Sequence, residues 1–122
     1  MTENDWIQKV VEAFYDKAKI DVLIGYHFRD IKDFHQHIPR IVTFWEFQLL
    51  GNASRETGEP FDLMRAHIPL GIKRGELGRW LVLFRQTLEQ ELQNSPDMLQ
   101  LKLDWDKKLE VFEGIFLRFF RF

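Results

Sequence analysis

The residues of this chain that could carry chemistry are a few histidines and polar-tipped aromatics. His67 lies in the stretch Ala-His-Ile-Pro-Leu-Gly, where Pro69 has no amide hydrogen to donate and Gly71 is a poor interior helix residue. We therefore expect His67 at the end of a short helix or on a turn. From there its imidazole could point into a cleft and bind a metal or a haem iron; the alternative is a histidine with a structural role.

Two further histidines, His35 and His37, stand two residues apart on a predicted helix. This spacing turns them about 200° from each other, so they cannot chelate one metal as an i, i+4 pair would. His37 shares its helix face with Ile41, which suits either a half-buried core residue or a pocket residue. Tyr15 and Trp80 also lie beside apolar neighbours, and each needs a hydrogen-bond partner if it is buried.

Composition excludes several kinds of chemistry. The 122 residues contain no cysteine, which excludes disulfides, thiolate zinc sites, iron–sulfur clusters, thiolate-ligated haem and a cysteine nucleophile. The sequence also lacks an HExxH motif, a glycine-rich phosphate loop, a nucleophile elbow and an EF-hand loop. The formal net charge of −2 argues against nucleic acid as a partner, because phosphate neutralisation requires a concentrated basic surface.

Aromatic residues are unusually frequent, with 12 Phe, 4 Trp and 2 Tyr making up 15% of the chain. They indicate either a core built from large side chains or a flat apolar ligand held between aromatic walls. The N-terminal stretch MTENDWIQKVVEAF places acidic residues before its apolar ones, unlike a secretory signal, and no apolar run is long enough to span a membrane. These features predict a cytoplasmic protein.

The hydrophobic pattern predicts an all-α fold with four main helices in two antiparallel pairs, forming a single domain over residues 1–122. A polar stretch over residues 51–60 and a short helix over residues 61–67 are expected between the two pairs. Pro39 either makes the first turn of the second helix irregular or kinks that helix. The four helices are expected over residues 5–19, 34–50, 73–93 and from residue 96 towards the C-terminal end.

Local signals predict where these helices begin. Asn4 or Asp5 is expected to cap the first helix and Asp33 the second, while Ser95 is expected to cap the last helix with Pro96 at its first position. The buried face of that last helix is expected to hold an apolar series at helical spacing. Its members are Leu101, Trp105, Leu109, Phe112 and Phe116.

Several segments together resemble a known family. FYDKAKID and LIGYHF come first, FHQHIPRIVTFW follows, and GEPFDLMRAHIPLGI precedes LGRWLVLFRQTL. In this order and at this spacing the chain resembles the group III truncated haemoglobins, a branch of the two-over-two globins. The resemblance covers the chain from about Phe14 to Leu88. It implies a two-over-two antiparallel helical sandwich around haem b, which is iron protoporphyrin IX.

The resemblance also implies roles for individual residues. His67 corresponds to the axial ligand of the haem iron. Tyr15, His37 and Trp80 correspond to the distal residues that stabilise a bound ligand by hydrogen bonding.

The remaining cofactor contacts follow from the same resemblance. Phe28 corresponds to the phenylalanine that stacks on the porphyrin, and Ile41 to the aliphatic residue over the iron. Arg40 is the candidate partner of a haem propionate. The rest of the expected haem-binding set is Phe14, Phe44, Leu70, Leu77 and Phe84.

By this resemblance the chain would bind O2, NO and CO at a histidine-ligated iron. Three hydrogen-bond donors around one ligand would hold oxygen too tightly for delivery, which favours NO dioxygenation or peroxide reduction with electrons from a reductase. Two alternatives stay open. One is a haem-based gas sensor read by a protein partner through the aromatic C-terminal helix, and the other is a haem-free helical interaction module.

Overall fold

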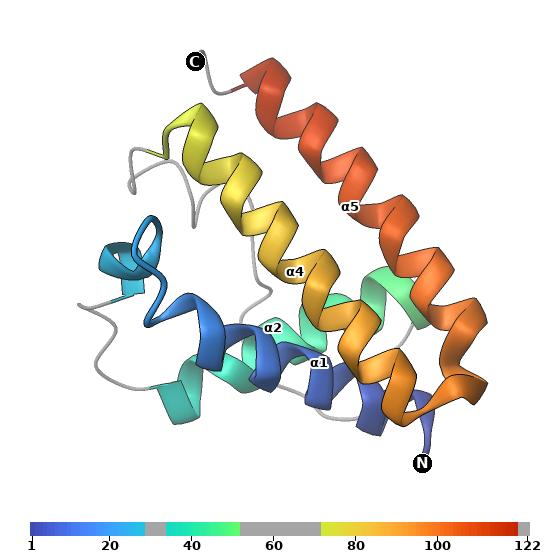
Figure 1. Ribbon diagram of the computed structural model, residues 1–122. Coiled ribbons are helices and arrows are strands. Elements are labelled where there is room, and N and C mark those ends of the chain that lie inside the picture. Colours follow the sequence, from blue (N-terminus) through green and yellow to red (C-terminus); the bar gives the residue numbers. More distant parts are fainter. Residues whose placement is uncertain (29–33, 52–71, 120–122) are drawn as a thin grey trace.

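The computed structural model describes residues 1–28, 34–51 and 72–119 (Figure 1). These residues contain helices and no strand, which confirms the prediction of an all-α protein. None of the helices in this part of the chain combines the length and apolar character needed to cross a bilayer. The elements are α1 (Glu3–Ala18), η1 (Gly25–Phe28), α2 (Phe34–Leu50), α4 (Arg74–Asn94), η3 (Pro96–Met98) and α5 (Leu99–Phe119).

Helix α1 begins two residues earlier than the sequence suggests. Thr2 is its N-cap: the Thr2 hydroxyl accepts a hydrogen bond from the Asp5 amide at 3.1 Å, and the Asp5 carboxylate accepts one from the Thr2 amide at 3.3 Å. The predicted cap at Asn4 or Asp5 is therefore wrong, because this reciprocal capping box satisfies two backbone donors at once. The buried stripe of α1 includes Trp6 and Phe14, both fully buried.

Helices α4 and α5 lie side by side and run in opposite directions (Figure 1). The turn between them begins with Pro96 at the start of η3, as predicted, but the side chain of Ser95 makes no capping hydrogen bond. Its hydroxyl instead contacts the sulfur of Met1 at 3.7 Å. Ser95 is thus the N-cap by position, as predicted, but of the 3-10 turn η3, and α5 begins only at Leu99.

Helices α1 and α2 contact each other, and each also contacts the α4/α5 pair. Trp105 of α5 is the centre of the shared core, because its fully buried ring meets aromatic rings from all three other helices. Ring centroids lie 6.0 Å away in Trp6, 5.3 Å in Trp45 and 5.5 Å in Phe84. Much of the aromatic content thus serves packing between helices.

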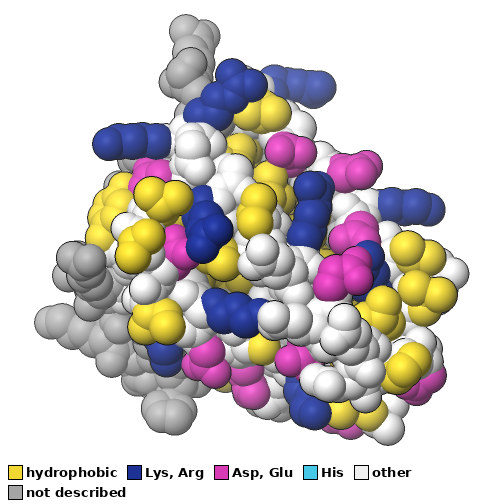
Figure 2. All heavy atoms as spheres, viewed as in Figure 1, with side chains coloured by type: hydrophobic (Ala, Val, Ile, Leu, Met, Phe, Trp, Pro, Cys, Tyr) yellow, Lys and Arg dark blue, Asp and Glu magenta, His cyan; other side chains and the backbone are white. Residues whose placement is uncertain are grey.

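The predicted inner face of α5 is confirmed. Leu101, Trp105, Leu109 and Phe116 are buried, and Phe112 is half-buried against the core. Basic and acidic side chains are interspersed on the face shown in Figure 2, without a concentrated basic patch there.

Candidate functional site

One pocket brings together side chains from α1, α2, α4, α5 and η1. Its volume is about 650 Å³ with the solvent at its open mouth included. Most of the lining is apolar, and seven of the eleven lining residues are aromatic or histidine. The lining residues are Tyr15, Ile24, His27, Phe28, Trp45, Ile72, Glu76, Leu77, Trp80, Phe112 and Phe116.

Tyr15 lies in the C-terminal part of α1, directly after the core residue Phe14. Successive helix residues point about 100° apart, so Tyr15 lines the pocket while Phe14 packs in the core. Its ring meets Phe28 edge-on, with 5.5 Å between centroids, and meets His37 edge-on at 6.1 Å. Burial raises the pKa of the Tyr15 phenol well above its ordinary range. The phenol therefore keeps its proton at neutral pH and can donate a hydrogen bond.

Trp80 approaches the same pocket from α4. Its ring lies edge-on to Phe14 at 5.6 Å and tilted against Phe84 at 5.2 Å, so two core rings fix its orientation. The indole is half-buried, and its N–H makes no hydrogen bond to a described residue. Trp80 and Tyr15 thus bring two hydrogen-bond donors from different helices to one cavity.

The other predicted haem-binding residues lie in two kinds of place. Leu77 and Phe28 line the pocket. Four others do not: they pack behind its wall, because helix periodicity directs them between helices. These four are Phe14, Ile41 and Phe84, which are buried, and Phe44, which is half-buried against the core.

His37 lies beside Tyr15 without lining the pocket itself. Arg40 is half-buried on α2 and forms no ion pair with a described residue. His67 and Leu70 fall outside the described residues, so the axial ligand and its neighbour stay predictions.

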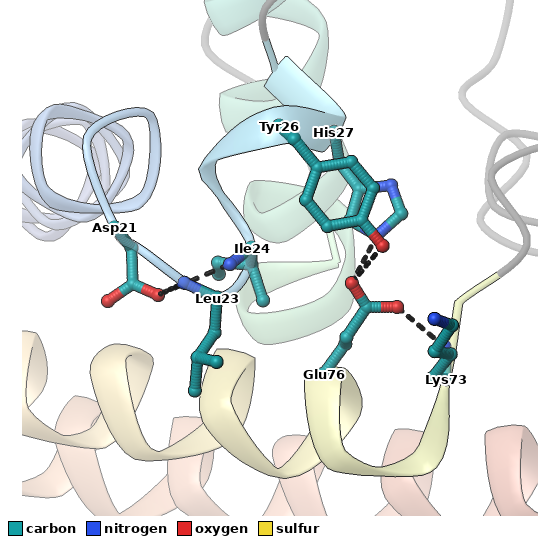
Figure 3. Close-up of polar contacts among 7 residues, drawn as sticks. All are labelled: Asp21, Leu23, Ile24, Tyr26, His27, Lys73 and Glu76. Atoms are coloured by element: carbon teal, nitrogen blue, oxygen red, sulfur yellow. Dashed lines mark hydrogen bonds and ion pairs between the residues drawn. The ribbon is translucent and has the colours of Figure 1, made fainter.

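A polar cluster that sequence reasoning missed stands in the wall of this pocket (Figure 3). The Glu76 carboxylate accepts hydrogen bonds from the Tyr26 hydroxyl and, at 3.0 Å, from Nε2 of His27. Its other oxygen accepts the Lys73 backbone amide at 2.9 Å. The His27 and Glu76 side chains are only 9% and 11% exposed, so their contact lies largely out of water, whereas Tyr26 is 42% exposed.

Protonation states in this cluster follow from its hydrogen bonds. Burial alone would raise the pKa of Glu76, but hydrogen bonds from Tyr26, the Lys73 amide and His27 outweigh burial and hold that pKa below its usual value of 4.5. The hydrogen bond to Glu76, together with burial, raises the pKa of Tyr26. At neutral pH Glu76 is therefore an ionised acceptor and Tyr26 a protonated donor.

A second ion pair fixes the same part of the chain to α4. Asp21 accepts two hydrogen bonds from the Arg79 guanidinium, at 2.8 and 3.0 Å, and also accepts the backbone amides of Leu23 and Ile24. The turn passes close to α1 at Gly25, where an added Cβ would lie 3.0 Å from the Lys19 carbonyl oxygen. A larger residue would push on this backbone carbonyl, so glycine favours the close approach that places η1 at the pocket.

The Glu76 contacts predict a stability change in acid. A carboxyl whose pKa is lowered on folding stabilises the fold above its unfolded pKa, and that contribution is lost as the pH falls through the folded value. We expect Glu76→Gln to lower the free energy of unfolding at neutral pH. The difference in this free energy between the parent protein and the variant should shrink as the pH falls below 4.5. Urea unfolding between about pH 6 and pH 3 measures both. A difference that is constant across this range would contradict the assignment.

Among residues 1–28, 34–51 and 72–119, no cluster of three or more histidine or acidic side chains could hold a metal ion. No family model, curated protein or solved structure matches this chain.

Proposed function

We propose that this chain is a haem b protein of the truncated-globin type, which binds O2, NO and CO in the pocket described above. The observation that carries the proposal is the meeting of Tyr15, Phe28, Leu77 and Trp80 in one cavity. These residues come from α1, η1 and α4, and the sequence resemblance implies a place in the haem site for each of them.

The residues that line the pocket fit such a group. A porphyrin is a flat and largely apolar ligand, and Phe28, Trp80 and Phe112 provide aromatic surface for it. His67 is the proposed axial ligand, as the sequence resemblance implies. Arg40 is the proposed propionate partner.

Haem b would supply an iron centre that binds diatomic molecules and exchanges electrons with them. The chain's contribution is to orient hydrogen-bond donors. The Tyr15 phenol is protonated at neutral pH, and desolvation raises its pKa further. The ring contacts of Trp80 hold its N–H in a fixed orientation. Each donor can stabilise a ligand that acquires negative charge by about 1–3 kcal/mol in a site without water. His37, the third predicted donor, lies edge-on to Tyr15 and does not line the pocket.

Such donors slow ligand release, since each 1.4 kcal/mol corresponds to about tenfold in affinity. We therefore propose redox chemistry on oxygen, NO or peroxide, with electrons from a separate reductase, in preference to oxygen delivery. The proposal extends to architecture: α1 and α2 would form one layer of the two-over-two sandwich, and α4 and α5 the other.

Haem binding itself is tested by titrating haemin into the haem-free protein. Trp45 and Trp80 line the pocket, so their fluorescence should be quenched with a break at one haem per chain. Quenching without a break, or no quenching, would count against a specific site.

A second candidate function is a gas sensor read by a partner on α5. The observation that favours it is a set of exposed apolar side chains on this helix, namely Leu99, Leu103, Val111 and Leu117. Hydrogen exchange of α5 in the ferrous protein, with and without CO, would support a sensor if protection changed along that helix. A haem-free interaction module would be favoured if haemin did not bind.

A further inference from the structure

The geometry around His27 determines which of its ring nitrogens carries the proton. An ionised carboxylate can only accept hydrogen bonds, so the contact of 3.0 Å between Nε2 and Glu76 requires Nε2 to be the donor. In the neutral imidazole the proton is therefore on Nε2, and Nδ1 has a free lone pair. Nδ1 makes no hydrogen bond to a residue in the described part of the chain.

His27 is also held in place from a second side. Its ring packs over the Tyr26 ring, with 4.1 Å between centroids, and Nε2 points to Glu76 while Nδ1, one ring carbon away, does not contact that carboxylate (Figure 3). The side chain is 9% exposed and forms part of the pocket lining. A carboxylate that fixes the tautomer and orientation of an imidazole is the arrangement that makes histidine an effective general base.

The pocket thus offers hydrogen-bonding groups of opposite kinds. Among the lining residues, Tyr15 and Trp80 carry hydrogen-bond donors, whereas Nδ1 of the neutral His27 ring is an acceptor. O2, NO and CO have no proton to give to an acceptor. A hydroperoxide can accept hydrogen bonds and also donate one, so it can use both kinds of group.

We propose that Nδ1 of His27 is the proton acceptor of this pocket, with Glu76 as its positioning residue, and that the substrates are hydroperoxides such as hydrogen peroxide. The inference rests on the proposed haem function and specifies its substrate class. The O–H bond of the peroxide breaks, its proton moves to Nδ1, and the electron pair stays on the hydroperoxide anion. No electrons are transferred in this step, and the Glu76 carboxylate balances the charge of the imidazolium.

The first test uses the haem-loaded ferric protein and hydrogen peroxide, with the rate constant measured by stopped flow. His27→Gln should lower this constant by about 100-fold or more, the usual contribution of a positioned acid or base. CO association to the ferrous protein needs no proton transfer and should change by less than about twofold. Asp21→Asn is the matched control, because it weakens the other contact between this turn and α4 while leaving the base intact.

The second test needs no haem. In NMR spectra of protein labelled with 15N-histidine, the neutral His27 ring should show a protonated Nε2 and an unprotonated Nδ1. The His27 signals are identified by their absence from the spectrum of His27→Gln. Glu76→Gln has one acceptor oxygen for three donors, so the preference for this tautomer should be lost. The same variant should slow the peroxide reaction by about tenfold without changing CO association.

The outcomes separate two failures. If His27→Gln binds haem and reacts with peroxide at the parent rate, or if the ring carries its proton on Nδ1, the inference about His27 is wrong and the haem function stands. If the parent protein takes up no haem, the proposed function fails and the hydroperoxide role fails with it. A slowed peroxide reaction with unchanged CO binding and the Nε2–H tautomer supports the inference.

Discussion

Replacing His67 with alanine should abolish stable haem retention. An axial imidazole is the protein's bond to the haem iron, whereas the aromatic walls supply only packing. Loss of outer hydrogen bonds to a metal ligand already costs 10- to 100-fold in affinity, so loss of the ligand should cost more than about 100-fold. The measurement is the rate of haem transfer to an excess of a scavenging apoglobin.

Two controls separate ligation from folding. His35→Ala removes a histidine that the helix pattern turns away from His37, and it should retain haem like the parent protein. Added imidazole should restore haem binding to His67→Ala, because the free ligand can occupy the site left by the side chain. If His67→Ala transferred haem at the parent rate, His67 would not be the axial ligand of the haem iron.

Oxygen should leave the pocket faster when either proposed donor is removed. Tyr15→Phe keeps the edge-on ring contact with Phe28 and loses only the hydroxyl, so it isolates the hydrogen bond. Trp80→Phe removes the indole N–H. We expect each substitution to raise the O2 dissociation rate about tenfold or more, corresponding to the loss of at least 1.4 kcal/mol.

Displacement of O2 by excess CO in stopped flow measures these rates. CO dissociation is the internal control, because CO develops less negative charge than O2 and should respond less to lost donors. Oxygen dissociation that is unchanged in both variants would show that Tyr15 and Trp80 do not act on the ligand.

The helices could be predicted largely from local patterns. The bounds of α2 match the prediction, because its apolar residues recur at helical spacing over residues 34–50. The ends are less predictable, since they depend on which side chain reaches a free amide. At α1, Thr2 is the N-cap because it exchanges two hydrogen bonds with Asp5. Before α5 the chain forms a 3-10 turn, and the Ser95 side chain makes no capping hydrogen bond.

The pocket was predictable only in part. Tyr15 and Trp80 could be selected as polar-tipped aromatics, but the sequence did not distinguish the wall residue Tyr15 from its core neighbour Phe14. The His27–Glu76 pair was missed because its members are 49 residues apart. Glu76 stands near the start of a helix, where an acidic residue is usual, so nothing local indicates its second role.

The central claim is that haem binds through a histidine in this pocket, and the absorption spectrum tests it most directly. The purified protein, reconstituted with haem, should be recorded in ferric, dithionite-reduced and CO-bound forms. We predict a ferrous–CO Soret band typical of histidine ligation at one haem per chain, and its loss in His67→Ala. A spectrum indistinguishable from free haem with CO, or a histidine-type band that persists in His67→Ala, would contradict the account.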